Sequence, residues 1–386
     1  MDKTTERHVL LLVSLYILSR LLMVVLVSQV HVDNVAHIIG ISRYDLRHNW
    51  RVYNTSFDKL PLLEKFGYSW DSIWYVEIAR NGYRLPPGYT SFPGVVTPPG
   101  LDPSCNLFYF LFMYPLSIWF FSVLMGYLPA GLFVSNASFI IAIVLFYKIA
   151  LNYLDSKSAL RAAVLFTLFP YNLNVMTSYS EPLYLVFVLL SWDFFLKGRL
   201  FLTGVFAMLA SLTRYPGAVL FPVLLLIVVK NNLGTNGWRN TFSKLILLSI
   251  FCIPIIYWDY VEIPMRTGYT KIELASITWG FTVFPGIGLV GASAIGVFFF
   301  YFAFLAAYYL KDINADLMIY SISFLIFHSS LYGFGASIGR YMGVIWPVFI
   351  YYGRKLDLMD VWVFSGIFLL LGGLLIELST NMVTFV

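Results

Sequence analysis

Long apolar runs recur along almost the whole chain, and this pattern constrains the fold more than any other feature. The first run spans residues 9–30, and others follow between residues 108 and 378. A run of about 20 apolar residues is long enough to cross a bilayer as a helix. Only 12% of the 386 residues are charged, against about 25% in soluble domains. The sequence therefore predicts an all-α polytopic membrane protein with a single transmembrane domain over residues 1–386.

The spacing of basic residues predicts how the chain threads the membrane. Lys3 and Arg7 precede the first span, which is too long for a cleaved signal peptide, so we expect a cytoplasmic N-terminus. Later Lys and Arg clusters fall on the same side if ten more spans cross and the Pro-broken segment 108–126 is re-entrant. The expected further spans are 128–149, 162–178, 182–197, 200–213, 216–230, 245–261, 285–310, 316–335, 341–353 and 361–378. Counting 108–126 as a crossing is the alternative.

The polar segment 31–107 is predicted to be a large external loop that carries interfacial helices. Within it, residues 70–83 read WDSIWYVEIARNGY. At helical spacing Trp70, Ile73, Trp74 and Ile78 share one apolar face, and a glycine follows that can end the helix. Because Trp and Tyr favour the membrane–water interface, we expect this helix to lie on the membrane surface and to hold Asp71 at headgroup level.

Several charged or titratable residues lie in or beside apolar runs, namely Arg20, Asp193, Asp259, His328 and Glu377. Such groups are costly in a membrane and must face the protein interior or a wet cavity. A polar cavity for a lipid-linked substrate would account for them. The alternatives are pairing between neighbours, as for Asp193 with Lys197, and snorkelling, as for Glu377. For Arg20 both interpretations stay open.

Other classes of site find little support in the sequence. The net charge of +5 is spread over short loops, so we interpret it as topology and expect no nucleic-acid partner. The two cysteines, Cys105 and Cys252, lie far apart and are expected to be unpaired structural thiols. Neither HExxH nor CxxC occurs. We therefore expect no metal and no cofactor.

Five ordered motifs resemble the PIG-V family, the GPI mannosyltransferase 2-like members of the GT-C glycosyltransferases, over residues 9–350. They are Trp70-Asp71 with Ile78-Ala79 and Gly82-Tyr83; Phe112–Leu116; Phe169-Pro170 through Tyr179-Ser180-Glu181; Leu209–Arg214 with Gly217; and Gly339-Arg340-Tyr341 with Pro347. The Pro- and Gly-rich stretch 85–103 departs from the family pattern, which leaves the acceptor specificity open. The short chain favours a prokaryotic, archaeal-type relative.

The resemblance implies a GT-C-type transmembrane helix bundle and an enzyme of GPI-anchor-biosynthesis type. It would move a sugar, mannose by preference, from a polyprenyl (dolichyl) phosphate donor to a glycolipid or glycan acceptor, with inversion. The bilayer would supply the donor, and the family leaves room for a small membrane partner subunit. The active site would face the exterior of a prokaryotic cell membrane or the lumen of the endoplasmic reticulum.

The chemistry suggests a role for each motif residue. Asp71 is the expected general base, since an attacking hydroxyl must lose its proton. Arg214 and Arg340 are expected to bind the donor phosphate, and Glu181 is a second catalytic carboxylate that orients the acceptor or an arginine. Trp70, Trp74, Tyr179 and Arg20 are expected to contact substrate.

Each role has a structural alternative that the sequence leaves open. Asp71 and Glu181 are also good helix-start residues, and the arginines are also suited to interfacial anchoring. Glu77 and Arg80 are expected to pair with each other without a catalytic role. At the level of the whole protein, the alternatives are a transporter or flippase of a lipid-linked substrate and a non-catalytic scaffold. A transporter would have matched broken helices in two halves.

Overall fold

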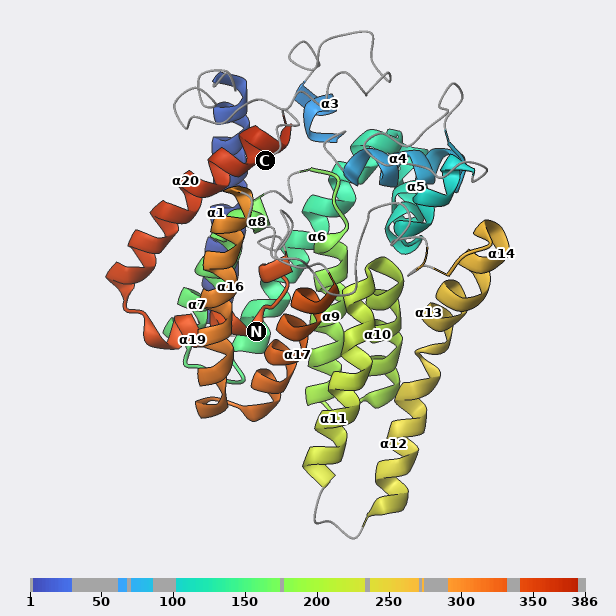
Figure 1. The fold of residues 1–386 in the computed structure, drawn as a ribbon. Helices are drawn as coiled ribbons and strands as arrows, with labels where there is room; N and C mark the ends of the chain where they lie inside the picture. The colour runs from blue at the N-terminus through green and yellow to red at the C-terminus, as the bar shows by residue number, and fades with distance from the viewer. Residues whose placement is uncertain are drawn as a thin grey trace.

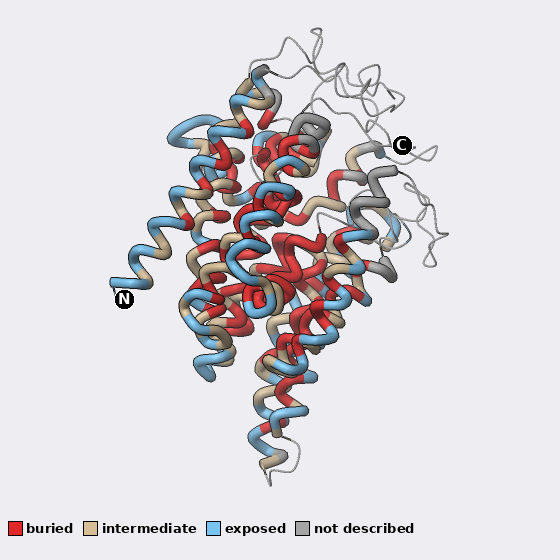
Figure 2. Tube along the Cα trace, turned by 90° about the vertical axis from the view of Figure 1, so that its left-hand side faces the viewer, coloured by how far each residue is buried: buried red, intermediate tan, exposed pale blue. Residues whose placement is uncertain are grey.

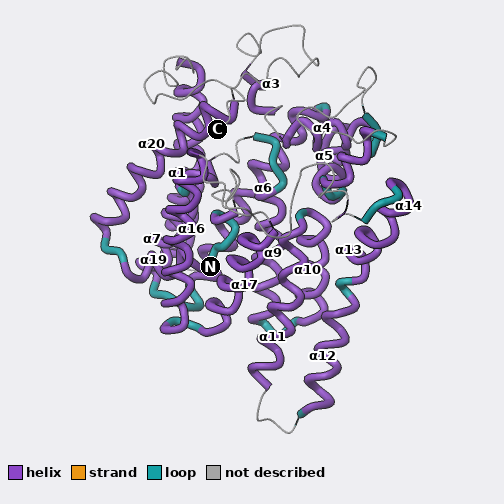
Figure 3. Tube along the Cα trace, in the orientation of Figure 1, coloured by secondary structure: helices purple, strands orange, loops and turns teal. Residues whose placement is uncertain are grey.

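The computed structural model describes residues 3–29, 62–67, 71–85, 102–173, 177–232, 237–270, 273, 291–331 and 341–380. Within these ranges the chain forms helices joined by turns, with no strand (Figure 3). The prediction of an all-α fold is therefore confirmed for the described residues.

The first half of the chain contributes two groups of helices. At the top of Figure 1 lie α3 (Leu62–Gly67), α4 (Asp71–Asn81) and α5 (Met113–Met125), with the 3₁₀ turn η3 (Pro103–Tyr109) before α5. The other helices of this half are α1 (Lys3–Gln29), which also reaches the top of Figure 1, and α6 (Tyr127–Ala150), α7 (Ser156–Leu168), α9 (Glu181–Leu196) and α10 (Leu200–Thr213). A short helix, α8 (Pro170–Leu173), follows α7.

The second half adds helices around this group. They are η5 (Tyr215–Val219), α11 (Leu220–Asn232), α12 (Trp238–Ile250), α13 (Ile253–Tyr257), the π turn η6 (Trp258–Glu262), α14 (Ile263–Thr267), α16 (Gly291–Tyr309), η7 (Leu310–Asp312), α17 (Ala315–Leu331), α19 (Pro347–Lys355) and α20 (Leu358–Thr380). The C-terminal end of α11 and the N-terminal end of α12 lie at the lower end of Figure 1.

Three helices in the described residues are long and apolar enough to cross a membrane: Lys3–Leu26, Tyr127–Ala150 and Tyr215–Asn232. A fourth span results if Arg239–Ile250 and Ile253–Thr267, which meet at 42°, count as one. This is well below the eleven crossings expected, because most of the remaining helices are shorter than 18 residues. Even so, helices of this length and composition are those of a membrane protein.

The segment expected to be re-entrant is a 13-residue helix, α5, too short to cross a bilayer alone. It ends at Gly126, whose φ of +82° only glycine adopts easily. The chain turns there directly into α6, and the Tyr114 hydroxyl on α5 donates to the Gly131 carbonyl on α6 at 3.0 Å. The two helices therefore form a hairpin, and the re-entrant placement of the segment in the membrane stays a prediction.

Local sequence signals explain the start of α7 and two ion pairs away from the candidate site. Asp155 begins α7 by accepting hydrogen bonds from the backbone N–H groups of Lys157 and Ser158. On α9, Lys197 pairs with Asp193 at 2.5 Å, as predicted from their spacing. Lys230 on α11 pairs with Asp316 on α17 at 2.6 Å.

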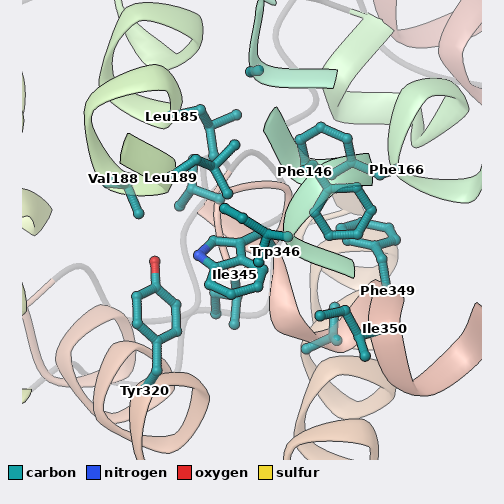
Figure 4. Close-up of a cluster of buried hydrophobic side chains, with 14 of the residues drawn as sticks. Phe146, Phe166, Leu185, Val188, Leu189, Tyr320, Ile345, Trp346, Phe349 and Ile350 are labelled. Atoms are coloured by element: carbon teal, nitrogen blue, oxygen red, sulfur yellow. The ribbon is translucent and has the colours of Figure 1, made fainter. Parts of the chain in front are cut away.

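The core lies between α6, α7, α9, α17 and α19, and Figure 2 shows buried residues in the middle of the molecule with exposed ones along its outer helices. Aromatic rings fill it, with Trp346 5.6 Å from Trp192 and Phe146 stacked 4.6 Å from Phe166. Figure 4 shows the Tyr320 hydroxyl directed toward the Trp346 indole. This core supports the upper ends of α9 and α10, where the candidate site lies.

Candidate functional site

Asp71 is the first residue of α4 and is half-buried. The helix ends at Asn81, and the Gly82 N–H donates to the Ile78 carbonyl with the Gly82 φ at +65°. Both the helix and its glycine stop follow the prediction. Asp71 therefore stands in the first turn of α4, at the N-terminal end of the helix.

The apolar face of α4 packs inward against protein, and the interfacial position expected for this helix stays a prediction. Ile73, Trp74 and Ile78 are each no more than 4% exposed, and they form a cluster with residues of α5 and α6. Trp74, predicted to contact substrate, belongs to this cluster. The sequence showed an apolar stripe but not what it packs against.

The outer side of α4 carries the predicted ion pair. Glu77 accepts from Arg80 at 3.1 Å and from Asn81 at 2.9 Å. Burial raises the pKa of the Glu77 carboxyl, and the charge of Arg80 together with the Asn81 hydrogen bond opposes that rise. Glu77 is thus held within its own helix.

The centre of the site is an ion pair between two elements far apart in sequence. Glu181 begins α9 and Arg214 directly follows α10. The Arg214 Nη1 lies 3.1 Å from the Glu181 Oε1, with side chains 10% and 6% exposed. Such a shielded pair fixes the guanidinium in one orientation.

Tyr75 links this ion pair to α4. Arg214 donates to the Ser180 hydroxyl at 2.8 Å, and Ser180 donates to the Tyr75 hydroxyl at 2.8 Å. Burial raises the pKa of Tyr75 to about 12; Arg214 opposes the rise, while Glu181 and Asp71 add to it. Tyr75 is therefore bonded to Ser180 and lies near the charges of Asp71, Glu181 and Arg214.

Two rings complete the surroundings of Arg214. Its guanidinium carbon lies 5.8 Å from the centroid of the Tyr341 ring. That ring lies 4.7 Å from the ring of His328, whose Nδ1–H donates to the Phe324 carbonyl on α17 at 2.7 Å. His328, predicted to face inward, is fully buried.

Arg20 lies on α1 and is also buried. Its guanidinium donates to the Asn172 carbonyl on α8 at 2.8 Å and lies 4.4 Å from the Tyr16 ring centroid. Asn172 in turn donates to the Phe166 carbonyl near the end of α7. These contacts give Arg20 a structural role at the break between α7 and α8.

The other predicted residues are placed as follows. Tyr179 is 4% exposed and immediately precedes Ser180. Trp70 and Arg340 lie outside the described residues, as does the greater part of the 31–107 loop. Both cysteines are free thiols, as expected. Among the described residues, no three His, Cys, Asp or Glu side chains gather as metal ligands would.

Sequence reasoning did not single out Tyr75 or a specific role for Ser180. Tyr75 stands between two residues of the predicted apolar stripe, and only the packing of α4 shows that its hydroxyl points to the ion pair. A run of small and hydroxyl residues before Glu181 was the available signal. Tyr215, which binds Asp259, was likewise not noted beside Arg214.

No protein-family model matches this chain, and no curated protein is similar to it. The resemblance drawn from the motifs therefore stays a prediction.

Proposed function

We propose that the protein is a glycosyltransferase of the GT-C type that uses a polyprenyl-phosphate-linked sugar, by preference mannose, as donor. The observation that carries this proposal is the meeting of Asp71, Glu181 and Arg214 around Tyr75 and Ser180. A base and a fixed cation on one end of an apolar bundle suit a reaction on a lipid phosphate.

In the proposed reaction, Asp71 removes the proton from a hydroxyl of the acceptor as that oxygen attacks the anomeric carbon. The bond from this carbon to the phosphate oxygen breaks, and the configuration inverts. The polyprenyl phosphate leaves with an added negative charge, which Arg214 stabilises. Arg340 is proposed to assist at the same phosphate.

Glu181 takes a narrower role in this proposal than that of a second base. Its carboxylate pairs with Arg214, so it orients the guanidinium toward the phosphate. A glycolipid or glycan is the proposed acceptor. By the positive-inside rule the site would face the exterior or lumen, because the basic turns of the chain belong to the opposite end.

The test is transfer from radiolabelled dolichyl-phosphate-mannose into extracted membrane lipids by the purified protein in vesicles. We expect labelled product from the wild type and a loss of at least about 100-fold in Asp71→Asn. Glu77→Gln is the matched control, since Glu77 lies on the same helix but pairs with Arg80; we expect it to transfer like the wild type.

Two results would overturn parts of the proposal. Equal transfer by Asp71→Asn and the wild type would remove Asp71 as base. No labelled product with the wild type would speak against the donor and favour a transporter of lipid-linked substrates, which an assay of lipid movement between leaflets would then test.

A further inference from the structure

Asp259 is a carboxylate within a bent, largely apolar span. The span consists of α12, α13, the π turn η6 and α14, and its two halves meet at 42°. In the π turn the Ile263 N–H donates to the Trp258 carbonyl, five residues back. A π turn and an acidic group inside a span are both features that mark functional positions.

The carboxylate is directed toward the chain that carries Arg214. The Tyr215 hydroxyl donates to the Asp259 Oδ1 at 2.6 Å. Tyr215 directly follows Arg214 and is the first residue of η5. Asp259 therefore binds the residue that directly follows Arg214, although 44 residues separate Asp259 from Tyr215.

The backbone of Arg214 is fixed on both sides of this contact. Its N–H donates to the Ala210 carbonyl at the end of α10, and its carbonyl accepts from Gly217 at 2.9 Å. Arg214 itself is extended, with φ −149° and ψ 142°. A shift of the Tyr215 ring would be transmitted to Arg214 because the Tyr215 hydroxyl joins this turn to the bent span through its hydrogen bond to Asp259.

The same segment also contacts the opposite side of the site. The ring of Trp258 lies 5.3 Å from that of Phe112 and 5.4 Å from that of Tyr83. Tyr83 follows α4, and its hydroxyl donates to the Phe110 carbonyl before α5. Trp258 of the π turn thus packs against residues next to α4 and α5, and Asp259 of the same turn binds Tyr215 beside Arg214.

We propose that Asp259 is a positioning residue for Arg214, which it holds against Glu181 through the Tyr215 hydroxyl. The benefit to sugar transfer rests on the proposed function, whereas the effect on the orientation of Arg214 does not. A contact that only stabilised the bent span would change the stability of the protein without changing the exposure of Arg214.

The test measures the reactivity of Arg214 toward phenylglyoxal by mass spectrometry, in the full-length protein in lipid nanodiscs. Arg80, whose side chain is 43% exposed, serves as the internal reference. We expect Tyr215→Phe and Asp259→Leu to raise the Arg214 rate by about tenfold, the factor that matches loss of one such hydrogen bond. The Arg80 rate should not change.

Two variants serve as controls. Asp259→Asn keeps an acceptor oxygen for Tyr215 and should restore most of the protection of Arg214. Tyr260→Phe removes a hydroxyl from the same π turn, but from a side chain that is 65% exposed, and should leave the rate as in the wild type. Melting midpoints of all variants identify any that fail to fold.

The outcomes separate this inference from the proposed function. An unchanged Arg214 rate in Tyr215→Phe overturns the positioning role, and so does an equal rise at Arg80, which would indicate general loosening. A selective rise at Arg214 in a protein whose wild type transfers no sugar supports the positioning role and overturns the glycosyltransferase proposal alone. Where transfer occurs, the KM for the donor should rise in Tyr215→Phe.

Discussion

The ion pair of Arg214 and Glu181 is the residue-scale feature on which the site depends. Both side chains are almost fully shielded from solvent, so each charge is compensated by the opposite charge of its partner. Ser180 adds a hydrogen bond to the guanidinium. Removing one partner of such a pair leaves the other charge buried and uncompensated, which costs more than the pair contributes.

Arg214→Gln should therefore lower the free energy of unfolding by about 3 kcal/mol. Arg214→Gln combined with Glu181→Gln should recover part of this loss, since no buried charge then remains. Thermal unfolding in detergent measures both effects. A double variant less stable than Arg214→Gln would contradict this account of the pair.

Tyr75 predicts a change of stability at alkaline pH. Its pKa of about 12 in the folded protein exceeds the value of about 10 in an unfolded chain. Below pH 10 the hydroxyl is protonated in both states. Between pH 10 and 12 only the unfolded chain releases the proton, so the free energy of unfolding falls as pH rises.

Tyr75→Phe removes this titration and should lose less stability than the wild type between about pH 9 and pH 11. Melting midpoints at the two pH values measure the difference. Tyr260→Phe, which removes an exposed hydroxyl, should keep the wild-type dependence. Parallel curves for Tyr75→Phe and the wild type would contradict the burial of this hydroxyl.

The sequence predicted the main charges of the site but not the hydroxyls between them. Asp71, Glu181 and Arg214 were identified because they stand in the ordered motifs and carry the charges that a base and a phosphate-binding group require. Ser180 and Tyr75 meet only through the packing of α4 on α5 and α6. Hydroxyl residues are too common in apolar segments for their pairing to be read from the sequence.

At the scale of elements, the turn after α10 packs very closely on the end of that helix. A Cβ on Gly217 would lie 2.4 Å from backbone atoms of Ala210 and Ser211. Backbone cannot yield as a flexible side chain can, so η5 packs this closely on α10 only with glycine at this position.

Gly217→Ala should displace η5 and lower the melting midpoint. It should also reduce the rate of sugar transfer, in which Arg214 is proposed to stabilise the leaving phosphate. Gly366→Ala on α20 is the matched control, because a Cβ there would meet nothing within 4 Å. In that helix alanine should be neutral or stabilising, by up to about 1 kcal/mol. Equal midpoints for the two variants would contradict the close approach of η5 and α10.

Helix positions were well predicted where the apolar runs end in polar turns. The span expected at 200–213 is α10 with the same bounds, and 128–149 differs from α6 by one residue at each end. The packing partners of α4 were not predicted. An apolar stripe on a helix is the same for a neighbour in the bundle as for lipid, so its pattern does not distinguish the two.

At the scale of the whole molecule, the chain has two chemically different ends. Lys197 follows the end of α9 that is opposite Glu181, and Lys157 and Lys311 lie in α7 and η7, whereas Asp71 begins α4 at the top of Figure 1. The positive-inside rule then predicts that the site faces outward.

Labelling of single cysteines tests this orientation in intact cells. In a chain with both native cysteines replaced by serine, Arg84→Cys after α4 should react with an impermeant maleimide. Asn152→Cys, in the exposed turn after α6, should react only after permeabilisation. The reverse pattern would place the site in the cytoplasm.

The hydrogen bond between Ser180 and Tyr75 also has a consequence for how the chain is made. Its partners are 105 residues apart, so α4 emerges from the ribosome well before α9 exists. At about 5–20 residues per second, the delay is about 5–20 seconds. During that time Tyr75 has no Ser180 to bind, so the site can assemble only after most of the first half of the chain has been made.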